Sequence, residues 1–433
     1  MSTPSNDAEL QQARAAAQAS RYGDADAAFR RVLARDPGHL EALNYLAQRA
    51  LLAGRTADAA AMLEQATARA NDSAELWKNL GFARLASGDA VAAAAALGRA
   101  VELDPKAFRA RLFLAQIHSN AGRVREATLQ YFGAIVAAQA QGRWLDEATT
   151  PPAMREGVLQ AMNFVDRHRR AIFAETLEPL RAKHGDAEFA RVMRCLDIYL
   201  GGAPADAPDP RQRPKFLYFP GLPTTPYFDR ALFPWYAALE DNVDTIRAEL
   251  REVLRDEQGI APFLGTNALD RVGDQLAGGE TPPAWDAFFF HRHGERHEEN
   301  CARCPRTAEI LDTLPLVRIR EHAPEICFSV LTPGTHILPH RGVTNTRLVT
   351  HLPLIVPDDC ALVVGGEKRE WREGECFTFD DTFEHEAWNR GASTRVVMLM
   401  DCWNPHLTQI ERDAIALLVG AIGDFNRAAG VND

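Results

Sequence analysis

The chain has 433 residues, of which 46% are hydrophobic and 25% charged, and its formal net charge is −11. These proportions are ordinary for a globular protein, and the acidic balance argues against a nucleic-acid partner, which would require a basic face. The first residues lack a basic segment followed by an apolar one, and no apolar run reaches the length of a membrane span. We therefore expect a cytoplasmic protein without a membrane span, built from two or three domains.

A period of 34 residues organises the first third of the chain, most visibly at Gly54, Gly88 and Gly122. Small residues allow two helices to approach closely, and a proline such as Pro105 ends a helix. The pattern resembles the tetratricopeptide repeat and predicts helical pairs over residues 1–140. The alternative is an Ala-rich bundle without repeats. The same register is kept by Leu46, Leu80 and Leu114, by Ala47, Gly81 and Ala115, and by Ala59, Ala93 and Ala127.

Residues 141–214 are predicted to connect this array to the rest of the chain. Apolar residues at helical spacing favour helix from about Trp144 to Ala203. The stretch from Gly201 to Pro214 is rich in Pro, Gly and Asp, which is typical of a linker.

The pattern changes after Pro214. A helical segment is expected near Leu239 to Leu254, and short β-branched runs separated by Gly, Pro and Asp follow from Glu325 onward. These runs predict a mainly β domain over residues 215–433, closed as a double-stranded β-helix of the cupin-like jelly-roll kind. The fold class is therefore a helical repeat array followed by a jelly-roll. The runs are residues 326–331, 335–340, 346–356, 360–365, 375–380 and 394–403.

The predicted strands carry His340, His351 and His385, together with Arg395 ten residues after the last of these. Imidazole suits divalent iron, and an arginine can bind a dicarboxylate through two parallel hydrogen bonds. The usual iron triad also needs a carboxylate two residues after the first histidine, but Gly342 stands there.

Two long motifs, Pro339–His351 and Phe379–Glu386, resemble the aspartyl/asparaginyl β-hydroxylase family. The resemblance implies that His340 and His385 alone bind Fe(II), with glycine where the carboxylate would be. Acidic residues of the second motif are expected in turns or in support of the ligands rather than on the metal.

The same resemblance assigns the co-substrate site. It implies that Arg347 and His351 hold the 1-carboxylate side of 2-oxoglutarate, and that Ser329 and Arg395 bind its distal carboxylate. His340, His385 and Arg395 would then be the catalytic set, and O2 would be the second co-substrate.

The implied activity is a 2-oxoglutarate-dependent dioxygenase that hydroxylates the β-carbon of Asp or Asn in a peptide or protein. Stacked repeats form a concave surface that commonly binds proteins, so we expect the repeats to recruit this substrate. Two alternatives stay open, namely an oxygenase acting on a lipid or small molecule and a non-catalytic interaction protein.

A second candidate metal site lies upstream of the first motif. Cys301 and Cys304 form a Cys-x-x-Cys pair close to several histidines, which is a pattern that can bind structural zinc. A second such pair is missing, so zinc is the lesser alternative, and the seven cysteines are expected to be mostly reduced. The histidines are His291, His293 and His297.

Overall fold

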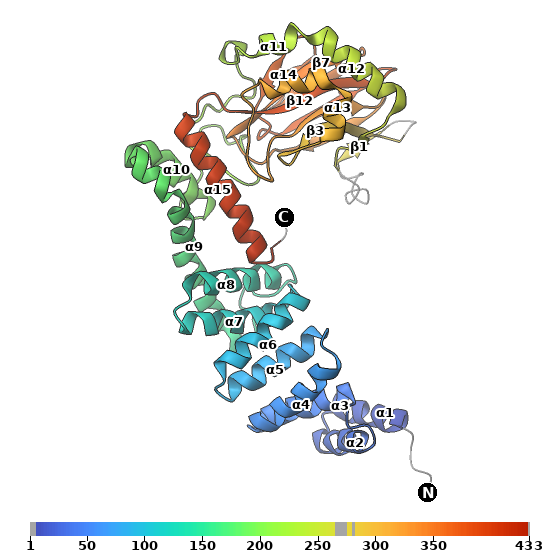
Figure 1. Cartoon of the computed structure of the whole chain (residues 1–433), viewed down its shortest axis with the longest axis vertical. Coiled ribbons are helices and arrows are strands. Elements are labelled where there is room, and N and C mark those ends of the chain that lie inside the picture. The colour runs from blue at the N-terminus through green and yellow to red at the C-terminus, as the bar shows by residue number, and fades with distance from the viewer. Residues whose placement is uncertain (1–5, 265–274, 279–281, 432–433) are drawn as a thin grey trace. The chain divides into compact units, whose positions relative to one another are not determined.

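The computed structural model describes residues 6–264, 275–278 and 282–431 and divides into two units (Figure 1). The first holds residues 1–172 with 423–433, and the second holds residues 173–422. The division falls inside α9 (Arg155–His184) and α15 (Gln409–Ala428), so two helices continue from one unit into the other. Across the described ranges, no helix is both long enough and apolar enough to cross a membrane.

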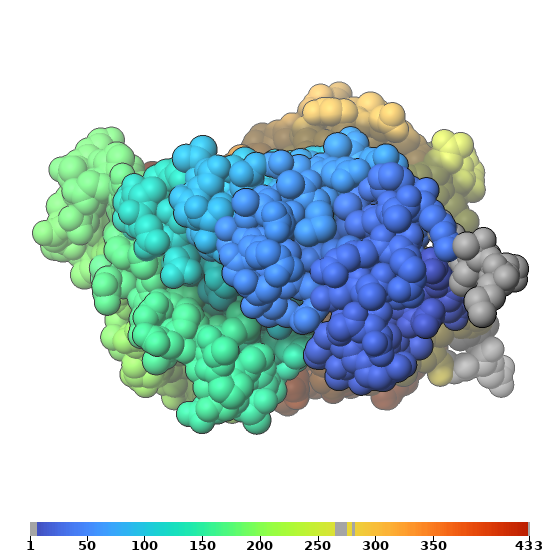
Figure 2. Space-filling view, turned by 90° about the horizontal axis from the view of Figure 1, so that it is seen from below, coloured from blue at the N-terminus to red at the C-terminus, as the bar shows by residue number. Residues whose placement is uncertain are grey.

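The first unit consists of helical pairs stacked side by side (Figure 1). Figure 2 shows the atoms of these repeats, coloured blue to cyan, packed into a continuous surface. Gly54, Gly88 and Gly122 each follow the first helix of a pair with φ between 72° and 84°, a conformation that glycine adopts without strain. The predicted helical pairs are confirmed. They comprise α1 (Asn6–Gln18), α2 (Tyr22–Arg35), α3 (Leu40–Leu52), α4 (Thr56–Arg69), α5 (Ala74–Ala86), α6 (Ala90–Leu103), α7 (Phe108–Asn120) and α8 (Val124–Gln139).

The small residues of the repeat allow close contact between paired helices. A Cβ atom on Gly81 would lie 2.5 Å from Cγ of Leu97, so α5 and α6 could not pack this tightly around a larger residue. The first helices of successive repeats also touch, because Asn79 on α5 donates a 2.8 Å hydrogen bond to Asn44 on α3. The 34-residue register is therefore set by packing within and between repeats.

The second unit contains two antiparallel sheets. The larger has the order β1-β3-β5-β12-β7-β10, with β4 paired to β3, and the smaller has the order β2-β6-β11-β8-β9. Strands β5 to β12 alternate between the sheets except at β8 and β9, which are neighbours in the smaller sheet. An antiparallel, sheet-rich domain after a helical repeat array confirms the predicted fold class.

Each of the six predicted strands overlaps an observed one, whereas β1 to β4, β9 and β11 were not predicted. The upstream strands are β1 (Ile260–Pro262), β2 (Leu276–Ala277), β3 (Trp285–Arg292) and β4 (Glu295–Arg296). The barrel strands are β5 (Ile326–Leu331), β6 (His336–His340), β7 (Arg347–Ile355), β8 (Cys360–Val364), β9 (Glu367–Arg369), β10 (Phe377–Phe379), β11 (His385–Asn389) and β12 (Arg395–Trp403).

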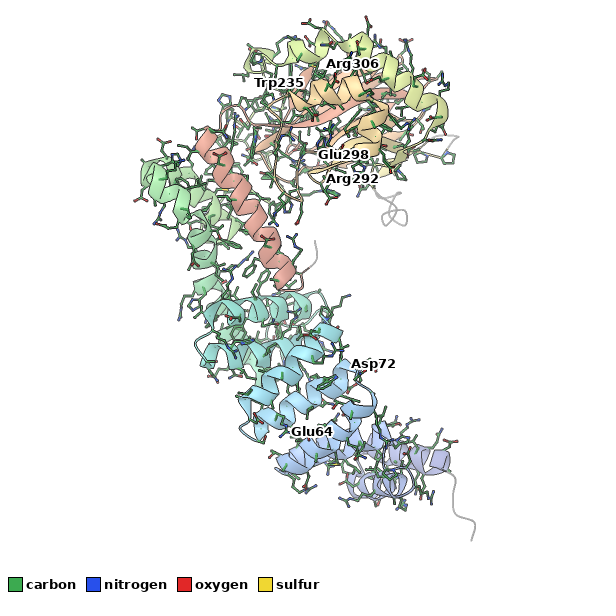
Figure 3. All side chains as sticks on the ribbon, in the orientation of Figure 1. Glu64, Asp72, Trp235, Arg292, Glu298 and Arg306 are labelled. Carbon is green, nitrogen blue, oxygen red and sulfur yellow. The ribbon has the colours of Figure 1, made fainter. Side chains whose placement is uncertain are left out.

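A helical layer covers the outer face of the larger sheet, and Trp235 and Arg306 mark it in Figure 3. Alternate residues of each strand, such as Phe328 and Met398, pack against this layer. Because neighbouring strand residues point to opposite faces, the residues between them face the barrel interior. The layer consists of α11 (Tyr236–Glu240), α12 (Val243–Asp256), α13 (Glu298–Arg303) and α14 (Pro305–Asp312).

The predicted helical connector is observed as α9 and α10 (Asp186–Tyr199), and α10 belongs to the second unit. Its Arg191 forms an ion pair of 2.6 Å with the buried Glu411. The stretch 201–214 contains neither helix nor strand, and it lies within the second unit rather than between the units. Its end is nevertheless attached to the barrel, because the buried Gln212 donates a 2.6 Å hydrogen bond to Asp380.

Candidate active site

His340 and His385 lie opposite each other on the paired strands β6 and β11, and their ring centroids are 4.1 Å apart. Nδ1 of His340 donates to the carbonyl oxygen of Leu338 at 2.8 Å, and Nδ1 of His385 donates to that of Phe383 at 3.1 Å. A carbonyl oxygen can only accept, so Nδ1 carries the proton and Nε2 presents a lone pair in both rings. Burial lowers the pKa of both histidines, that of His385 to about 3, which keeps them neutral as metal ligands must be.

The position of the missing carboxylate is filled from the turn between β10 and β11. A Cβ atom on Gly342 would lie 2.1 Å from Cγ of Asp381, so the Asp381 side chain occupies the space that a side chain at 342 would need. The Gly342 N–H donates to the Asp381 carbonyl oxygen at 2.6 Å. Asp381 is buried, its Oδ1 has no hydrogen-bond partner in the described structure, and burial raises its pKa to about 7. A carboxylate therefore stands beside the histidines without belonging to the first motif.

Arg347 is surrounded by carboxylates. Its guanidinium is bonded to Asp401 on β12 and lies 3.8 Å from Asp381. Burial alone would lower the pKa of Arg347, but Asp401, Asp381 and Glu325 together raise it. The prediction that Arg347 holds the 1-carboxylate of a co-substrate is not tested by this geometry, which shows its charge already balanced.

Arg395 has the opposite environment. It is buried at 2% exposure, none of the described carboxylates pairs with it, and its Nε has no hydrogen-bond partner. Burial lowers its pKa to about 10. Its Nη1 makes only long contacts, 3.4 and 3.5 Å, with the backbone oxygen and Oγ of Ser329. The Ser329 hydroxyl also accepts a 2.9 Å hydrogen bond from the Trp285 indole. Ser329 and Arg395 thus lie together, around a positive charge that no carboxylate of the described residues compensates.

His351 is buried near this end of the interior, and Trp371 contacts it. The indole Nε1–H of Trp371 donates to His351 Nδ1 at 3.2 Å, and the guanidinium of Arg395 lies 5.0 Å from the Trp371 ring centroid. Trp371 was not among the predicted site residues. In the sequence it is a single tryptophan between charged residues, and only the three-dimensional contact reveals its place.

The described residues fit a divalent metal with a dicarboxylate beside it. Two neutral imidazoles with free Nε2 atoms can bind iron, and the uncompensated Arg395 can bind an anion. His340, Ser329, His351 and Arg395 lie on predicted strands, whereas His385 lies on β11, which was not predicted. Their roles stay predictions.

The remaining acidic residues of the second motif make local contacts. Asp380 accepts hydrogen bonds from the Thr382 N–H and hydroxyl, at 2.9 and 2.5 Å, and so fixes the turn before β11. Glu384 lies 3.3 Å from Arg341, and Glu386 lies 2.7 Å from His336. These contacts agree with the predicted turn and supporting roles.

The alternative zinc site does not form. No three His, Cys, Asp or Glu side chains converge as metal ligands anywhere in the described ranges, which include all five residues proposed for it. Cys301 contacts the carbonyl oxygen of Phe290 at 3.7 Å, Cys304 is fully buried, and His293 faces Glu325 at 3.0 Å. Arg292 and Glu298 mark this neighbourhood in Figure 3.

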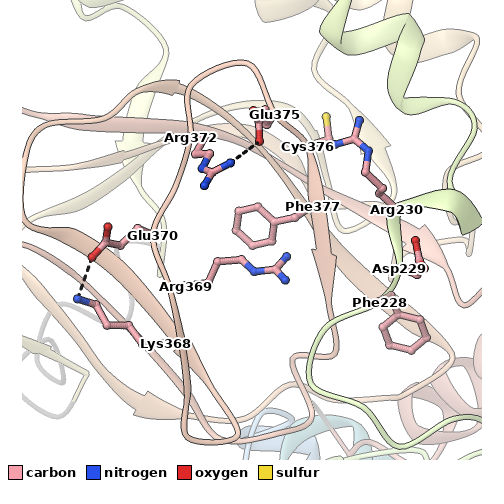
Figure 4. Close-up of a pocket in the computed structure, with 10 residues that line it drawn as sticks. All are labelled: Phe228, Asp229, Arg230, Lys368, Arg369, Glu370, Arg372, Glu375, Cys376 and Phe377. Carbon is pink, nitrogen blue, oxygen red and sulfur yellow. Dashed lines mark hydrogen bonds and ion pairs between the residues drawn. The ribbon is translucent and has the colours of Figure 1, made fainter.

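A pocket of about 640 Å³ opens elsewhere on the barrel (Figure 4). Its cations are largely balanced, since Arg230, Lys368 and Arg372 each pair with a glutamate. Arg369 lies 4.3 Å from the Tyr227 ring centroid. The pocket therefore shows no charge excess that would select a ligand. Its lining comprises Phe228, Asp229, Arg230, Lys368, Arg369, Glu370, Arg372, Glu375, Cys376 and Phe377.

Residues 240–405 match the family described as aspartyl/asparaginyl beta-hydroxylase. These residues all lie in the second unit. Residues 16–80 and 84–144 match the tetratricopeptide repeat, which confirms the predicted array. The hydroxylase match begins at α11 and ends just after β12, so it includes both histidine motifs.

Curated relatives match the hydroxylase domain at moderate identity. "Aspartate beta-hydroxylase domain-containing protein 2" of Xenopus tropicalis is 36% identical over 208 residues, covering 47% of this chain and 54% of the relative. "Aspartyl/asparaginyl beta-hydroxylase" of Homo sapiens is 36% identical over 42% of this chain and 24% of its own length. "Ornithine lipid ester-linked acyl 2-hydroxylase" of Rhizobium tropici is 34% identical, covering 44% of this chain and 64% of the relative. The chain thus spans about half the length of the first relatives it matches.

Proposed function

We propose that the chain is an Fe(II)- and 2-oxoglutarate-dependent dioxygenase that hydroxylates an unactivated C–H bond. The observation that carries the proposal is the pairing of two neutral histidines, Nε2 free, with a buried arginine that none of the described carboxylates balances. A ligand that binds both the histidine pair and the arginine must combine a metal ion with an anionic group. The family match and the names of the curated relatives support hydroxylation.

In this proposal the chain positions and shields the reacting groups. Iron with 2-oxoglutarate and O2 supplies the oxidising chemistry. His340 and His385 hold the metal, and their bonds to the carbonyl oxygens of Leu338 and Phe383 fix the rings. Arg395 and Ser329 take the distal carboxylate, and His351 lies where it can meet the other end. Asp381, which fills the place beside Gly342, would put a hydrogen-bond acceptor next to His385.

The proposed substrate is the β-carbon of an Asp or Asn residue in a peptide or protein, which the name of the human relative supports. A lipid acyl chain is the second candidate, supported by the Rhizobium relative and by apolar side chains on the interior face of the larger sheet. Phe263 stacks on Trp285 at 3.9 Å, and the Trp285 ring lies 6.3 Å from that of His340.

A direct assay separates the two substrate classes. The full chain is incubated with Fe(II), 2-oxoglutarate and O2, and with either a library of Asp- and Asn-containing peptides or acylated amino-acid lipids. Mass spectrometry then follows the gain of one oxygen atom, and succinate is measured in parallel. Oxygen gain in a peptide at Asp or Asn supports the proposal, whereas oxygen gain in the acyl chain alone moves it to lipids. Failure of both substrates together with no binding of metal or 2-oxoglutarate would exclude dioxygenase function.

We further propose that the repeats recruit a protein substrate and so raise its concentration at the hydroxylase domain. Truncation is a poor test, because removing residues 1–203 would also delete α10 and the ion pair between Arg191 and Glu411. Point changes in the array are cleaner. Phe82 on α5 and Phe113 on α7 form a half-buried ring pair, 5.0 Å apart, that joins two successive repeats.

Replacing both rings with Ala should raise the KM for a full-length protein substrate and leave a short peptide substrate unaffected. Val91→Ala is the control, because Val91 lies on α6, is 84% exposed and is not part of this ring pair. Circular dichroism checks that the array stays helical. An unchanged KM for the protein substrate in a folded double variant contradicts recruitment through this surface.

A further inference from the structure

Trp371 joins two groups of the candidate site that lie on different strands. Its indole Nε1–H donates to Nδ1 of His351 on β7 at 3.2 Å, and its ring lies 5.0 Å below the guanidinium of Arg395 at the start of β12. Trp371 is 5% exposed, His351 is 6% exposed and Arg395 is 2% exposed, so neither contact is shared with bulk water.

The first contact fixes the tautomer of His351. An indole N–H is a donor only, so Nδ1 of His351 must accept and therefore carries no proton. Burial, followed by the charge of Arg395, lowers the pKa of His351 well below its ordinary value, so the ring is neutral. A neutral ring with a bare Nδ1 carries its single proton on Nε2. His351 thus presents a donor to any ligand that approaches its Nε2, and donors are what a carboxylate requires.

The second contact supports the charge of Arg395. The face of an indole is the strongest aromatic partner for a cation, and the interaction strengthens when both partners are desolvated. Since none of the described carboxylates neutralises Arg395, the Trp371 ring is a main favourable electrostatic partner that the protein itself provides.

The segment that carries Trp371 is attached at several points. The Gly374 N–H donates to the carbonyl oxygen of Pro353 at 2.9 Å, and the Val356 N–H donates to Glu373 at 2.9 Å. The Cys376 N–H donates to Glu240 at 2.7 Å. Figure 4 shows the neighbouring residues of this segment lining the outer pocket, to which Trp371 does not contribute. These contacts fix the chain after Trp371, and the pairing of Arg369 on β9 with Leu362 on β8 fixes it before.

We propose that Trp371 is a positioning residue for the dicarboxylate co-substrate, which orients His351 as an Nε2–H donor and holds the Arg395 guanidinium by ring contact. This inference rests on the proposed function. It assigns one residue, outside both histidine motifs, to the two ends of the same ligand. Loss of the indole N–H should free the His351 ring to exchange tautomers, whereas loss of the whole ring should also weaken the hold on Arg395.

The decisive variant is Trp371→Phe, which keeps an aromatic ring for Arg395 and removes the N–H together with the pyrrole ring that carries it. We expect its affinity for 2-oxoglutarate to fall on the order of tenfold, as is usual when a supporting hydrogen bond is removed from a ligand-binding group. Trp371→Leu should lose more, because the cation then has no ring. Calorimetric titration of the Mn(II)-loaded full chain with 2-oxoglutarate measures both. Mn(II) affinity itself should stay unchanged, since the indole does not contact His340 or His385.

A second readout needs neither metal nor turnover. In the metal-free chain labelled with 15N-histidine, the ring-nitrogen shifts distinguish the two neutral tautomers, and a His351→Gln variant identifies the His351 signals. Wild type should show the Nε2–H form, and Trp371→Phe should show a mixture. Trp388→Phe is the matched control, because the Trp388 Nε1 is buried without a partner among the described residues. It should change neither the tautomer nor the affinity.

The outcomes separate this inference from the proposed function. If wild type fails to bind 2-oxoglutarate, the proposed function is wrong and the assignment of Trp371 falls with it. If wild type binds and Trp371→Phe binds equally well, the positioning role is wrong while the dioxygenase proposal stands. An Nδ1–H form of His351 in wild type also overturns the inference, whatever the variants do.

Discussion

The two ends of β12 place very different charge environments inside the same barrel. At Arg395 the interior holds a guanidinium with no carboxylate partner in the described structure, and its pKa is lowered. Six residues along the strand, Asp401 faces Arg347 together with Asp381, and there the guanidinium pKa is raised. The guanidinium of Arg395 can therefore bind an anionic ligand, whereas the guanidinium of Arg347 already binds carboxylates of the protein.

This difference separates a binding residue from a structural one. Removing one partner of a buried ion pair leaves an uncompensated charge and lowers stability. Removing a buried charge that has no partner instead removes the cost of burying it. The stability of the unliganded protein should therefore respond in opposite directions to the loss of the two arginines. Co-substrate binding should depend chiefly on Arg395.

The largest expected effect concerns the two predicted metal ligands, His340 and His385. His385→Ala should abolish metal binding and turnover, because one remaining imidazole cannot chelate iron. Titration with Mn(II) or Fe(II) measures the loss. The control is His336→Ala. His336 lies on β6, the strand of His340, but its Nε2 is bonded to Glu386 at 2.7 Å. Metal affinity at the wild-type level in His385→Ala would contradict the ligand assignment.

The next effect tests the uncompensated arginine. Arg395→Met should weaken 2-oxoglutarate binding by roughly a hundredfold or more, because a charge-assisted hydrogen-bonded contact in a buried site contributes several kcal/mol. Arg395→Lys should restore little, since ammonium cannot form two parallel hydrogen bonds. In the unliganded protein, Arg395→Met should leave the melting temperature unchanged or raise it. A clear drop in melting temperature would mean that Arg395 is balanced by a partner after all.

Arg347 should behave in the opposite way. Arg347→Met leaves Asp401, Asp381 and Glu325 buried without their shared cation, at a cost of roughly 3–5 kcal/mol. The measurement is the unfolding free energy of the unliganded chain in denaturant. A variant as stable as wild type, with 2-oxoglutarate binding lost, would instead favour the prediction that Arg347 holds the co-substrate.

The contrast between the two regions also explains what the sequence could and could not predict. Both histidines, Ser329 and Arg395 lie in predicted strands or long motifs, so pattern and resemblance were enough to find them. Trp371 and the pairing of Asp381 with Gly342 depend on segments about 20 to 40 residues apart being folded together. Helix α15 was not predicted, although Ile415, Leu418 and Ile422 recur at helical spacing and are buried. Strand β11 was missed because it is short and partly polar.

A smaller effect tests why glycine stands at position 342. Gly342→Ala would bring Cβ to about the 2.1 Å contact with Asp381 Cγ, and crowding of this kind costs roughly 1–3 kcal/mol. Asp381→Ala should remove the clash, so the double variant should be more stable than the sum of the single changes predicts. Thermal unfolding of the four proteins in this cycle gives the coupling. Additive effects would show that Asp381 moves aside freely and does not fill the carboxylate position.

The smallest effect is a pH dependence in the carboxylate-rich region. Burial raises the pKa of Glu325 from an ordinary 4.5 to about 7, even though it accepts the His293 N–H at 2.7 Å and faces Arg347 and Arg292. The folded chain therefore keeps a proton that the unfolded chain releases, so stability falls as pH rises from about 4.5 to 7. Glu325→Gln cannot lose that proton and should remove roughly 1–3 kcal/mol of this decline. Calorimetric unfolding at several pH values measures the difference, with the largely exposed Glu384→Gln as control. Part of the decline should persist, because the pKa of Asp381 is raised over the same window. An identical pH profile in Glu325→Gln would mean that the Arg347 region already compensates Glu325 in full.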